Sequence, residues 1–464
     1  MGHLLLLRGK TNPDLFSKTW LWLLGVDYAL VNAAFVQDIE GCMASTIGSY
    51  GISNQEFQEE LSYCGRALTD FRLACQNKKI PALDMVQSMQ SLEELVPIAE
   101  KISEKFRTVL VLGVGGSSLG GSALIDSLGV LASDNKRPDL RFVDNIDPES
   151  VERLLATISL DTTFFLVISK SGKTLSTLAQ FLIFCDLVAS SFGRQVVPDH
   201  FIVVTEASAN PLRRSAGRMG IRVLDHNPEI GGRFSIFSVA GLVPALIAGI
   251  DCRGLLDGAA VALETILSET PIETIEAARG AAVIAGLAKR RKIITNVMMP
   301  YSDRLRNFGF WYRQLVAESL GKDGEGILPV NAMGTVDQHS QLQLFLDGPP
   351  DKMVTFIGIS SLEGSRLIPS SLLDGAEGPL FANTSLGDLF EAEYMATIKS
   401  LTSAGRPTRK FALSSLGAEN LGGLLTHFMV EVILLGGRFR VNPFDQPAVE
   451  TGKKMVRELL LNSH

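Results

Sequence analysis

The chain has 464 residues, 46% of them hydrophobic, with a mean hydropathy of +0.21, so it can bury two sizeable cores. Its formal net charge is -7 with both signs spread along the sequence, which argues against a basic surface for nucleic acid and against a polybasic membrane anchor. We therefore expect a small-molecule ligand. Five cysteines without a CxxC spacing argue against a disulfide framework and a structural zinc site, and favour a reducing cytoplasm: Cys42, Cys64, Cys75, Cys185 and Cys252.

The first hundred residues, 1–100, are expected to be mostly helical and to pack onto the second of two lobes. Their main apolar segments lie at 20–36 and 84–98. Polar and charged residues separate the apolar runs at 4–7 and 20–25, so neither is long enough to cross a bilayer, and no small-residue cleavage site follows. We expect no targeting signal and a cytoplasmic protein.

From about residue 105, short β-branched and aromatic runs alternate with helical periodicity, which is typical of parallel sheets with crossover helices. The pattern predicts an α/β protein with two doubly wound parallel-sheet lobes, the first over 101–245 and the second over 246–464, ending in a C-terminal helix. Strands are expected at 108–114, 140–145, 162–169, 200–207 and 221–226 in the first lobe, and at 292–300, 327–333, 352–360 and 409–415 in the second. Helices are expected at 272–291, 305–320 and 420–435.

A glycine-rich turn, GGSSLGG, follows the first predicted strand and opens a helix. In open α/β sheets such turns present backbone N–H groups to the anionic or hydroxyl groups of a ligand. The turn is similar to a dinucleotide fingerprint, and Asp144 could serve as its ribose acid, but Ser118 stands where the third glycine belongs. A tight turn without a ligand also stays open.

The sequence FFLVISKSGKTLST places four hydroxyl groups and two lysines directly after a buried strand and on the first turn of a helix. They are Ser169, Lys170, Ser171, Lys173, Thr174 and Thr177. Hydroxyls, free backbone donors and a helix N-terminus bind a phosphate dianion without a metal. SGKT imitates the end of a Walker A loop, but Val167 stands where that motif needs glycine, so a P-loop ATPase is not expected. An ordinary helix cap accounts for one hydroxyl and not for four.

The segment WYRQLVAESLGK sets Gln314 and Glu318 one helical turn apart in an otherwise apolar helix that ends before Gly321. A carboxylate buried there needs a partner or a function, and burial should raise its pKa toward the range of a general base. A structural glutamate paired with a neighbouring Arg or Lys is the alternative.

Arg233 follows two glycines and precedes an apolar run, so we expect its guanidinium near the backbone and directed into a cleft, where it could stabilise an oxyanion. A structural salt bridge is the alternative. His339 follows a predicted strand at the start of a helix, a position consistent with acid and base catalysis, although a single histidine of this kind is usually structural.

Near the C-terminus, Gln446 and Lys453 are seven residues apart, and we expect them two turns apart on one face of a helix whose start is marked by Asp445 and Pro447. Both could reach one cleft. A lysine on a terminal amphipathic helix is more often simply solvated.

Together these segments resemble the glucose-6-phosphate isomerase family. GVGGSS, SKSGKT, GGRFS, QLVAESLGK, GTVDQHSQLQ and NPFDQPAVETGK are similar to its signature stretches, in the same order, from residue 113 to 453. The resemblance implies two sugar-isomerase lobes and a homodimer. It also implies reversible conversion of glucose 6-phosphate to fructose 6-phosphate, in glycolysis and gluconeogenesis, with no metal or organic cofactor.

The resemblance also implies roles for individual residues. Glu318 would move a proton between C2 and C1 of the open-chain sugar through an enediolate, and Arg233 would stabilise the enediolate charge. His339, contributed across the dimer interface, and Lys453 would move protons during ring opening. The substrate-binding residues would be Ser117, Ser169, Lys170, Ser171, Thr174, Thr177, Gln314 and Gln446.

The chain departs from the family pattern at Lys173 and Ser176, where members usually have threonine and an acidic residue. We expect Lys173 to be compatible with phosphate binding and to slow product release. Two other functions remain open: a non-catalytic sugar-phosphate sensor of the same fold, and a related isomerase that acts on an aminosugar phosphate or also on mannose 6-phosphate.

Overall fold

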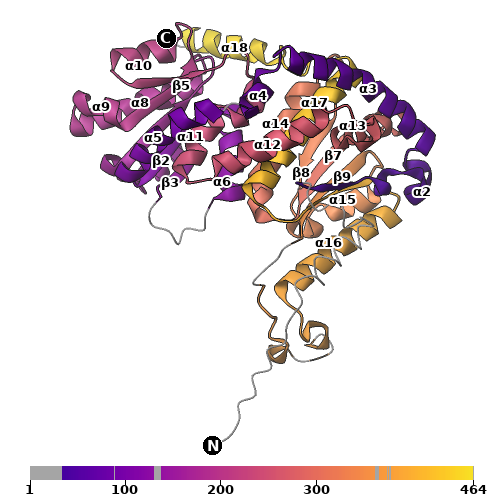
Figure 1. The fold of residues 1–464 in the computed structure, drawn as a ribbon. Helices are drawn as coiled ribbons and strands as arrows, with labels where there is room; N and C mark the ends of the chain where they lie inside the picture. The colour runs from indigo at the N-terminus through magenta and orange to yellow at the C-terminus, as the bar shows by residue number, and fades with distance from the viewer. Residues whose placement is uncertain are drawn as a thin grey trace, which may run out of the picture.

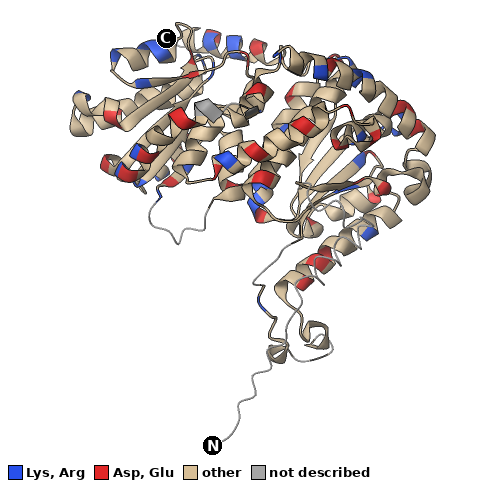
Figure 2. Cartoon of the chain, in the orientation of Figure 1, with Lys and Arg blue, Asp and Glu red and all other residues tan. Residues whose placement is uncertain are grey.

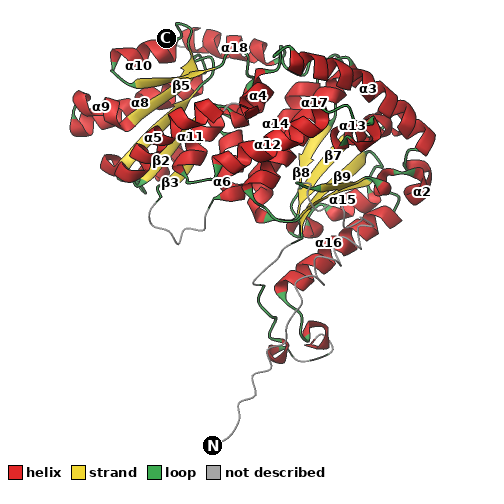
Figure 3. Cartoon of the chain, in the orientation of Figure 1, coloured by secondary structure: helices red, strands yellow, loops and turns green. Residues whose placement is uncertain are grey.

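Two five-stranded sheets stand side by side, with helices between them and around them (Figures 1 and 3). The computed structural model describes residues 34–87, 89–129, 137–360, 365–373, 375 and 378–462. All nine predicted strands are present, and the predicted α/β class with parallel sheets is confirmed.

The first sheet is entirely parallel, in the order β3-β2-β4-β5-β6. Its central strand, β4, is buried along its whole length, because helices cover both faces of the sheet, and this explains the unbroken apolar run of its sequence. The strand order reverses between β2 and β4, which makes their carboxyl ends the expected place for a ligand. The strands are β2 (Thr108–Leu112), β3 (Asp139–Val143), β4 (Thr163–Ile168), β5 (Phe201–Glu206) and β6 (Arg222–His226).

The second sheet, in the order β1-β10-β9-β7-β8, is parallel except for β1 at its edge. β1 was not predicted: a three-residue edge strand is too short to show a period, and only its antiparallel pairing with β10 defines it. The apolar segment at 20–36, in the region expected to be mostly helical, lies mostly outside the described residues, and at its end Val36 begins this strand. The strands are β1 (Val36–Asp38), β7 (Thr295–Pro300), β8 (Leu328–Asn331), β9 (Lys352–Ile359) and β10 (Thr408–Leu413).

The core follows the alternation of side chains along the strands. In β2, Val109 and Val111 belong to a cluster that continues into the second lobe, whereas Leu110 and Leu112 face the opposite side of the sheet. A third cluster covers the outer face of the second sheet. The sequence predicted two cores, whereas the described residues form one core shared by both lobes and a further core on the outer face of each sheet.

The space between the sheets and beside the second sheet is filled by α12, α13, α14 and α17. The helix predicted at 305–320 is α14, and the helix predicted at 420–435 is α17. In the N-terminal region, α3 packs on α13 and α17, whereas α5 packs on α11. α5 crosses residue 100, and the domain boundaries at 100 and 245 stay predictions. The main helices are α3 (Asn54–Gln76), α5 (Met89–Lys105), α6 (Leu119–Leu128), α7 (Pro148–Leu155), α8 (Leu175–Phe192), α10 (Pro211–Arg218), α11 (Val239–Ile247), α12 (Cys252–Leu267), α13 (Glu276–Arg291), α14 (Arg306–Leu320), α16 (Leu386–Ser403), α17 (Ala418–Phe439) and α18 (Val449–Asn462). Shorter helices are α2 (Ala44–Ile47), α4 (Pro81–Asp84), α9 (Val197–His200) and α15 (Leu342–Asp347).

Two described helices, α8 and α17, have the length and hydropathy of a membrane span. In α17 the apolar window is 89% buried inside the protein, so the core accounts for its composition. α8 packs its buried face on the outside of the first sheet and is partly exposed. Positive and negative side chains are interspersed over the molecule in the view of Figure 2, as the composition predicted.

Candidate active site

Two loops meet where the strand order of the first sheet reverses. The glycine-rich turn, residues 113–118, leaves the carboxyl end of β2, and the loop formed by residues 169–174 leaves the carboxyl end of the neighbouring β4. We call this second loop the hydroxyl loop. Because parallel strands end at the same edge of a sheet, both loops lie at one edge, where open α/β sheets bind ligands.

The glycine-rich turn is fixed against a second glycine segment. A side-chain carbon added to Gly116 would lie 2.2 Å from the carbonyl carbon of Gly232, so the two backbones touch and Gly116 has no room for a larger residue. Ser235 also donates a hydrogen bond to the carbonyl of Gly116, at 3.2 Å. Since Arg233 directly follows Gly232, this contact brings Arg233 to the turn that carries Ser117.

Arg233 is fully buried and uses all five of its N–H donors. Nε donates to Oγ of Ser319 at 2.7 Å, while the terminal nitrogens donate to Oε2 of Glu318 at 3.2 Å, to Oε1 of Gln446 at 2.8 Å and to the carbonyls of Pro443 and Asp445 at 2.6 and 3.0 Å. Burial lowers the pKa of Arg233 from its ordinary value, and the carboxylate of Glu318 opposes this shift. The side chain therefore joins α14 to residues 443–446 through a fixed positive charge.

Glu318 lies on the last turn of α14 and is held through both oxygens. Gln314, one turn earlier, donates to Oε1 at 3.0 Å, and Arg233 pairs with Oε2. Gln314 in turn lies beside the glycine-rich turn, since a side-chain carbon on Gly115 would be 3.2 Å from its amide nitrogen. The indole of Trp311 donates to the carbonyl of Arg233 at 3.2 Å, which ties the same helix to the arginine.

The prediction that Glu318 is buried in an apolar helix is wrong. Its side chain is 32% exposed, because the buried stripe of α14 runs through Phe308, Trp311, Leu315 and Ser319, and Glu318 lies at the margin of that stripe. Water therefore reaches the carboxylate. The alternative of a structural pair with an arginine is present in part, since Arg233 is its ion partner.

The hydroxyl loop has the form of an anion site. Thr174 is the N-cap of α8, yet it makes no side-chain bond to the helix, and Oγ of Ser169 donates to it at 3.4 Å. Gly172 has a φ of +59°, and a side-chain carbon there would lie 1.9 Å from Oδ1 of Asn210. Ser169 and Thr177 are buried, whereas Thr174 is exposed. Four hydroxyls at the start of α8 are therefore more than a helix cap requires.

Lys170 lies in this loop at the edge of the sheet and is partly buried. Burial lowers its pKa, the carboxylate of Glu206 opposes that shift, and the positive charge of Arg233 adds to it. Thr205 donates to the carbonyl of Lys170 at 3.0 Å, which fixes the backbone of the loop. The positive charges of Lys170 and Arg233 are therefore close enough to repel each other.

Comparisons with known proteins agree on one family. A family model described as phosphoglucose isomerase matches residues 75–360, which is more than half of the chain. A glucose-6-phosphate isomerase of Rubrobacter xylanophilus is 38% identical over 375 residues, covering 80% of this chain and 86% of that one. A probable glucose-6-phosphate isomerase of Haloquadratum walsbyi is 40% identical over 352 residues, covering 76% and 79%. The chain belongs to the phosphoglucose isomerase family.

Solved structures agree with this family assignment. A hypothetical protein of Thermus thermophilus superposes with a TM-score of 0.80 at 30% identity, covering 92% of this chain and 99% of that one. A glucose-6-phosphate isomerase of Chlamydia trachomatis gives 0.67 at 25% identity, covering 80% and 73%. The family and the enzyme class expected from the six motifs are confirmed, and no comparison favours a non-catalytic sensor.

Of the remaining residues expected from the family, Gln446 is in the cluster but not where it was predicted. It lies before α18, which begins at Val449, and therefore does not share a helix face with Lys453. The prediction failed because the loop at 442–446 is held by Arg233 and does not continue the helix. Lys453 is 60% exposed and pairs with Glu450 at 2.6 Å.

His339 is exposed on the short helix Val336–His339 of the second lobe, after β8. Among the described contacts of this single chain, none joins it to Glu318 or Arg233. The sequence interpretation missed Ser319 and Lys322, although both lie in the QLVAESLGK motif. Ser319 accepts a hydrogen bond from Arg233, and Lys322 donates one to the carbonyl of Asn442.

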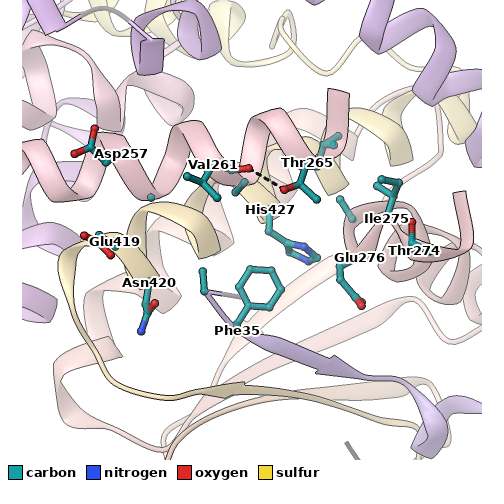
Figure 4. Close-up of a pocket in the computed structure, with 15 residues that line it drawn as sticks. Phe35, Asp257, Val261, Thr265, Thr274, Ile275, Glu276, Glu419, Asn420 and His427 are labelled. Carbon is teal, nitrogen blue, oxygen red and sulfur yellow. Dashed lines mark hydrogen bonds between the residues drawn. The ribbon is translucent and has the colours of Figure 1, made fainter. Parts of the chain in front are cut away.

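A separate cavity of about 580 Å³ lies between α12, the start of α13 and the start of α17 (Figure 4). It shares no residue with the Arg233 cluster. About half of its described lining residues are polar, with Asp257, Glu276, Glu419 and His427 among them, and the lining contains neither lysine nor arginine. A phosphate ester has no cationic partner there, so the loops at the first sheet remain the candidate site. Within the described residues, no three His, Cys, Asp or Glu side chains form a group that could hold a metal ion.

Proposed function

We propose that this chain interconverts glucose 6-phosphate and fructose 6-phosphate at the cluster formed by Arg233, Gln314 and Glu318. The observation that carries the proposal is the setting of Glu318, a partly exposed carboxylate held by two side chains. One is Gln314, which lies beside the glycine-rich turn, and the other is Arg233, whose charge acts on Lys170 of the hydroxyl loop. The glucose-6-phosphate isomerases to which it is similar support the choice of substrate.

The hydroxyl loop would bind the phosphate. Its hydroxyls, the ammonium of Lys170 and the first backbone N–H groups of α8 supply donors and positive charge, which a dianion needs. Ser117 would add a hydroxyl from the glycine-rich turn, whereas Gln446 would lie beside the sugar. The phosphate-binding hydroxyls would be those of Ser169, Ser171, Thr174 and Thr177.

Glu318 would act as the base. Its carboxylate takes the proton from C2 of the open-chain aldose while the aldehyde oxygen at C1 takes the negative charge. The proton is then returned to C1, and the hydroxyl proton of O2 passes to O1, so that C2 becomes the carbonyl carbon of the ketose. Each carboxylate oxygen accepts one hydrogen bond and keeps a lone pair, so the bonds to Gln314 and Arg233 do not block the transfer. They hold the acceptor atom in place.

Arg233 would stabilise the enediolate through its charge. All five of its N–H groups are already used within the protein, so it offers the oxyanion a fixed electrostatic field rather than an unused donor. A group that needs no reorganisation during the reaction is most effective in this role.

Ring opening would need Lys453 and His339 of the partner subunit, which makes a cytoplasmic homodimer the proposed active form. Mixing the Glu318→Gln and His339→Ala proteins tests this. If a site takes its histidine from the partner, two inactive proteins should recover about a quarter of the wild-type activity through mixed dimers with one intact site. No recovery would exclude a shared site.

The main test supplies fructose 6-phosphate and detects glucose 6-phosphate, comparing wild type with Glu318→Gln. General-base loss should lower kcat by about 10²- to 10⁴-fold. Glu325→Gln is the matched control, since Glu325 follows the same helix and pairs with Lys289. Equal rates for wild type and Glu318→Gln would exclude the mechanism, and binding without turnover in both would favour the sensor. Mannose 6-phosphate and an aminosugar phosphate, offered in the same assay, define the specificity at C2.

A further inference from the structure

Lys322 joins the end of α14 to the loop at residues 442–446, which we call the C-terminal loop. Its side chain is only 10% exposed. Nζ donates to the carbonyl of Ser319 at 3.2 Å and to the carbonyl of Asn442, and it pairs with Oδ1 of Asp445 at 3.0 Å. An ammonium group has three donors, and here three acceptors surround it.

Lys322 and Arg233 therefore hold the same loop from two sides. Together they supply eight donors, and five of the acceptors belong to the C-terminal loop, whereas the other three belong to Glu318 and Ser319 on α14. Asp445 is held twice, its carboxylate by Lys322 and its carbonyl by Arg233.

The loop is also braced from within. Asn442 donates to Oδ2 of Asp445 at 3.1 Å and accepts from the backbone N–H of Phe444 at 3.0 Å. The ring of Phe444 packs against that of Phe234 at 5.4 Å. Asp445 thus has little freedom while Lys322 holds it, and Gln446 is the next residue in the chain.

We propose that Lys322 and Asp445 are positioning residues of this isomerase. Their ion pair fixes the C-terminal loop so that Gln446 stays on Arg233, and it sets the starting point of α18, which carries Lys453. Neither side chain touches the substrate. The inference rests on the proposed function, because it gives the pair the role of holding Gln446 and Lys453 in place at that site.

The test compares kcat, KM and inhibition by inorganic phosphate in the wild type, Lys322→Met, Asp445→Asn, Lys322→Arg and the double variant Lys322→Met/Asp445→Asn. Displacing a catalytic group by about 1 Å can cost about 100-fold, so we expect each single loss to lower kcat by about tenfold or more. Inhibition by phosphate, which reports on the hydroxyl loop, should stay within about twofold. Lys322→Arg should recover most of the rate, and the double variant should be no slower than the singles, because both remove one pair.

Lys289→Met is the control, since it breaks a neighbouring ion pair, with Glu325, that does not reach the C-terminal loop. A wild-type kcat in both Lys322→Met and Asp445→Asn would overturn the inference. A fall in kcat accompanied by an equal loss of phosphate inhibition would also overturn it, because a general structural defect produces that result. If Lys322→Met does not fold, Asp445→Asn decides, because Asp445 is 52% exposed and the change keeps its shape. An inactive wild type would overturn the proposed function as well, whereas an active wild type with an inactive Glu318→Gln leaves that function standing.

Discussion

Replacing Arg233 by lysine keeps the positive charge and removes the five-donor geometry. The arginine donates to Ser319, Glu318 and Gln446 and to two carbonyls of the C-terminal loop, and it is fully buried. A lysine has three donors, so at least two of the five acceptors lose their partner. The change separates the role of charge from the role of geometry.

The expected loss of stability can be worked out from these contacts. A hydrogen bond involving a charged group contributes roughly 1.5–3 kcal/mol, so two lost bonds should lower the free energy of unfolding by about 3–6 kcal/mol. At about 2.1 cal/mol/K per residue, unfolding of the whole chain as one unit has an entropy near 1 kcal/mol/K, so Tm should fall by about 3–6 °C. Since Glu318 loses its anchor, kcat should fall by about 100-fold.

Differential scanning fluorimetry and the coupled isomerase assay measure the two quantities. Arg279→Lys is the control: Arg279 is 27% exposed and pairs with Glu276 on the surface of its own helix, so its replacement should cost less than about 1 kcal/mol and leave kcat unchanged. An Arg233→Lys protein with the stability and kcat of the wild type would show that charge alone suffices and that the five-donor argument is mistaken.

Three further predictions concern other parts of the molecule. Glu431→Leu leaves the guanidinium of Arg409 fully buried without an anion and should cost about 3–5 kcal/mol in chemical denaturation, whereas adding Arg409→Met should restore most of the stability; an equally unstable double variant would contradict this. Burial lowers the pKa of His226 from its ordinary value of 6.5, so below pH 6.5 this histidine binds more protons in the unfolded chain than in the folded one. The free energy of unfolding should therefore be constant above pH 6.5 and decline as the pH falls toward the folded pKa. Tm measured from pH 7.5 to 5.5 should decline less in His226→Gln, and equal declines would count against the assignment. Lys173→Thr should speed product release and raise kcat, and a variant with unchanged KM and kcat would refute a role for this lysine.

The sequence by itself determined the family and nine of the ten described strands. Apolar runs such as that of β4 have to be buried on both faces, and this constraint is visible without any tertiary contact. The order of the six motifs identified the phosphoglucose isomerase family, and α14 was expected because its apolar residues recur at helical spacing. These features depend on residues close together in the chain.

Only the tertiary structure decided how the candidate site is assembled. Glu318 is partly exposed and paired with Arg233, 85 residues away, and Gln446 lies in a loop rather than on α18, 213 residues from the same arginine. β1 exists because β10 is beside it, and Lys322 binds a loop that begins 120 residues later. Burial and ion pairing depend on which distant segments meet, and a local period carries no information about a partner that folding brings from elsewhere in the chain.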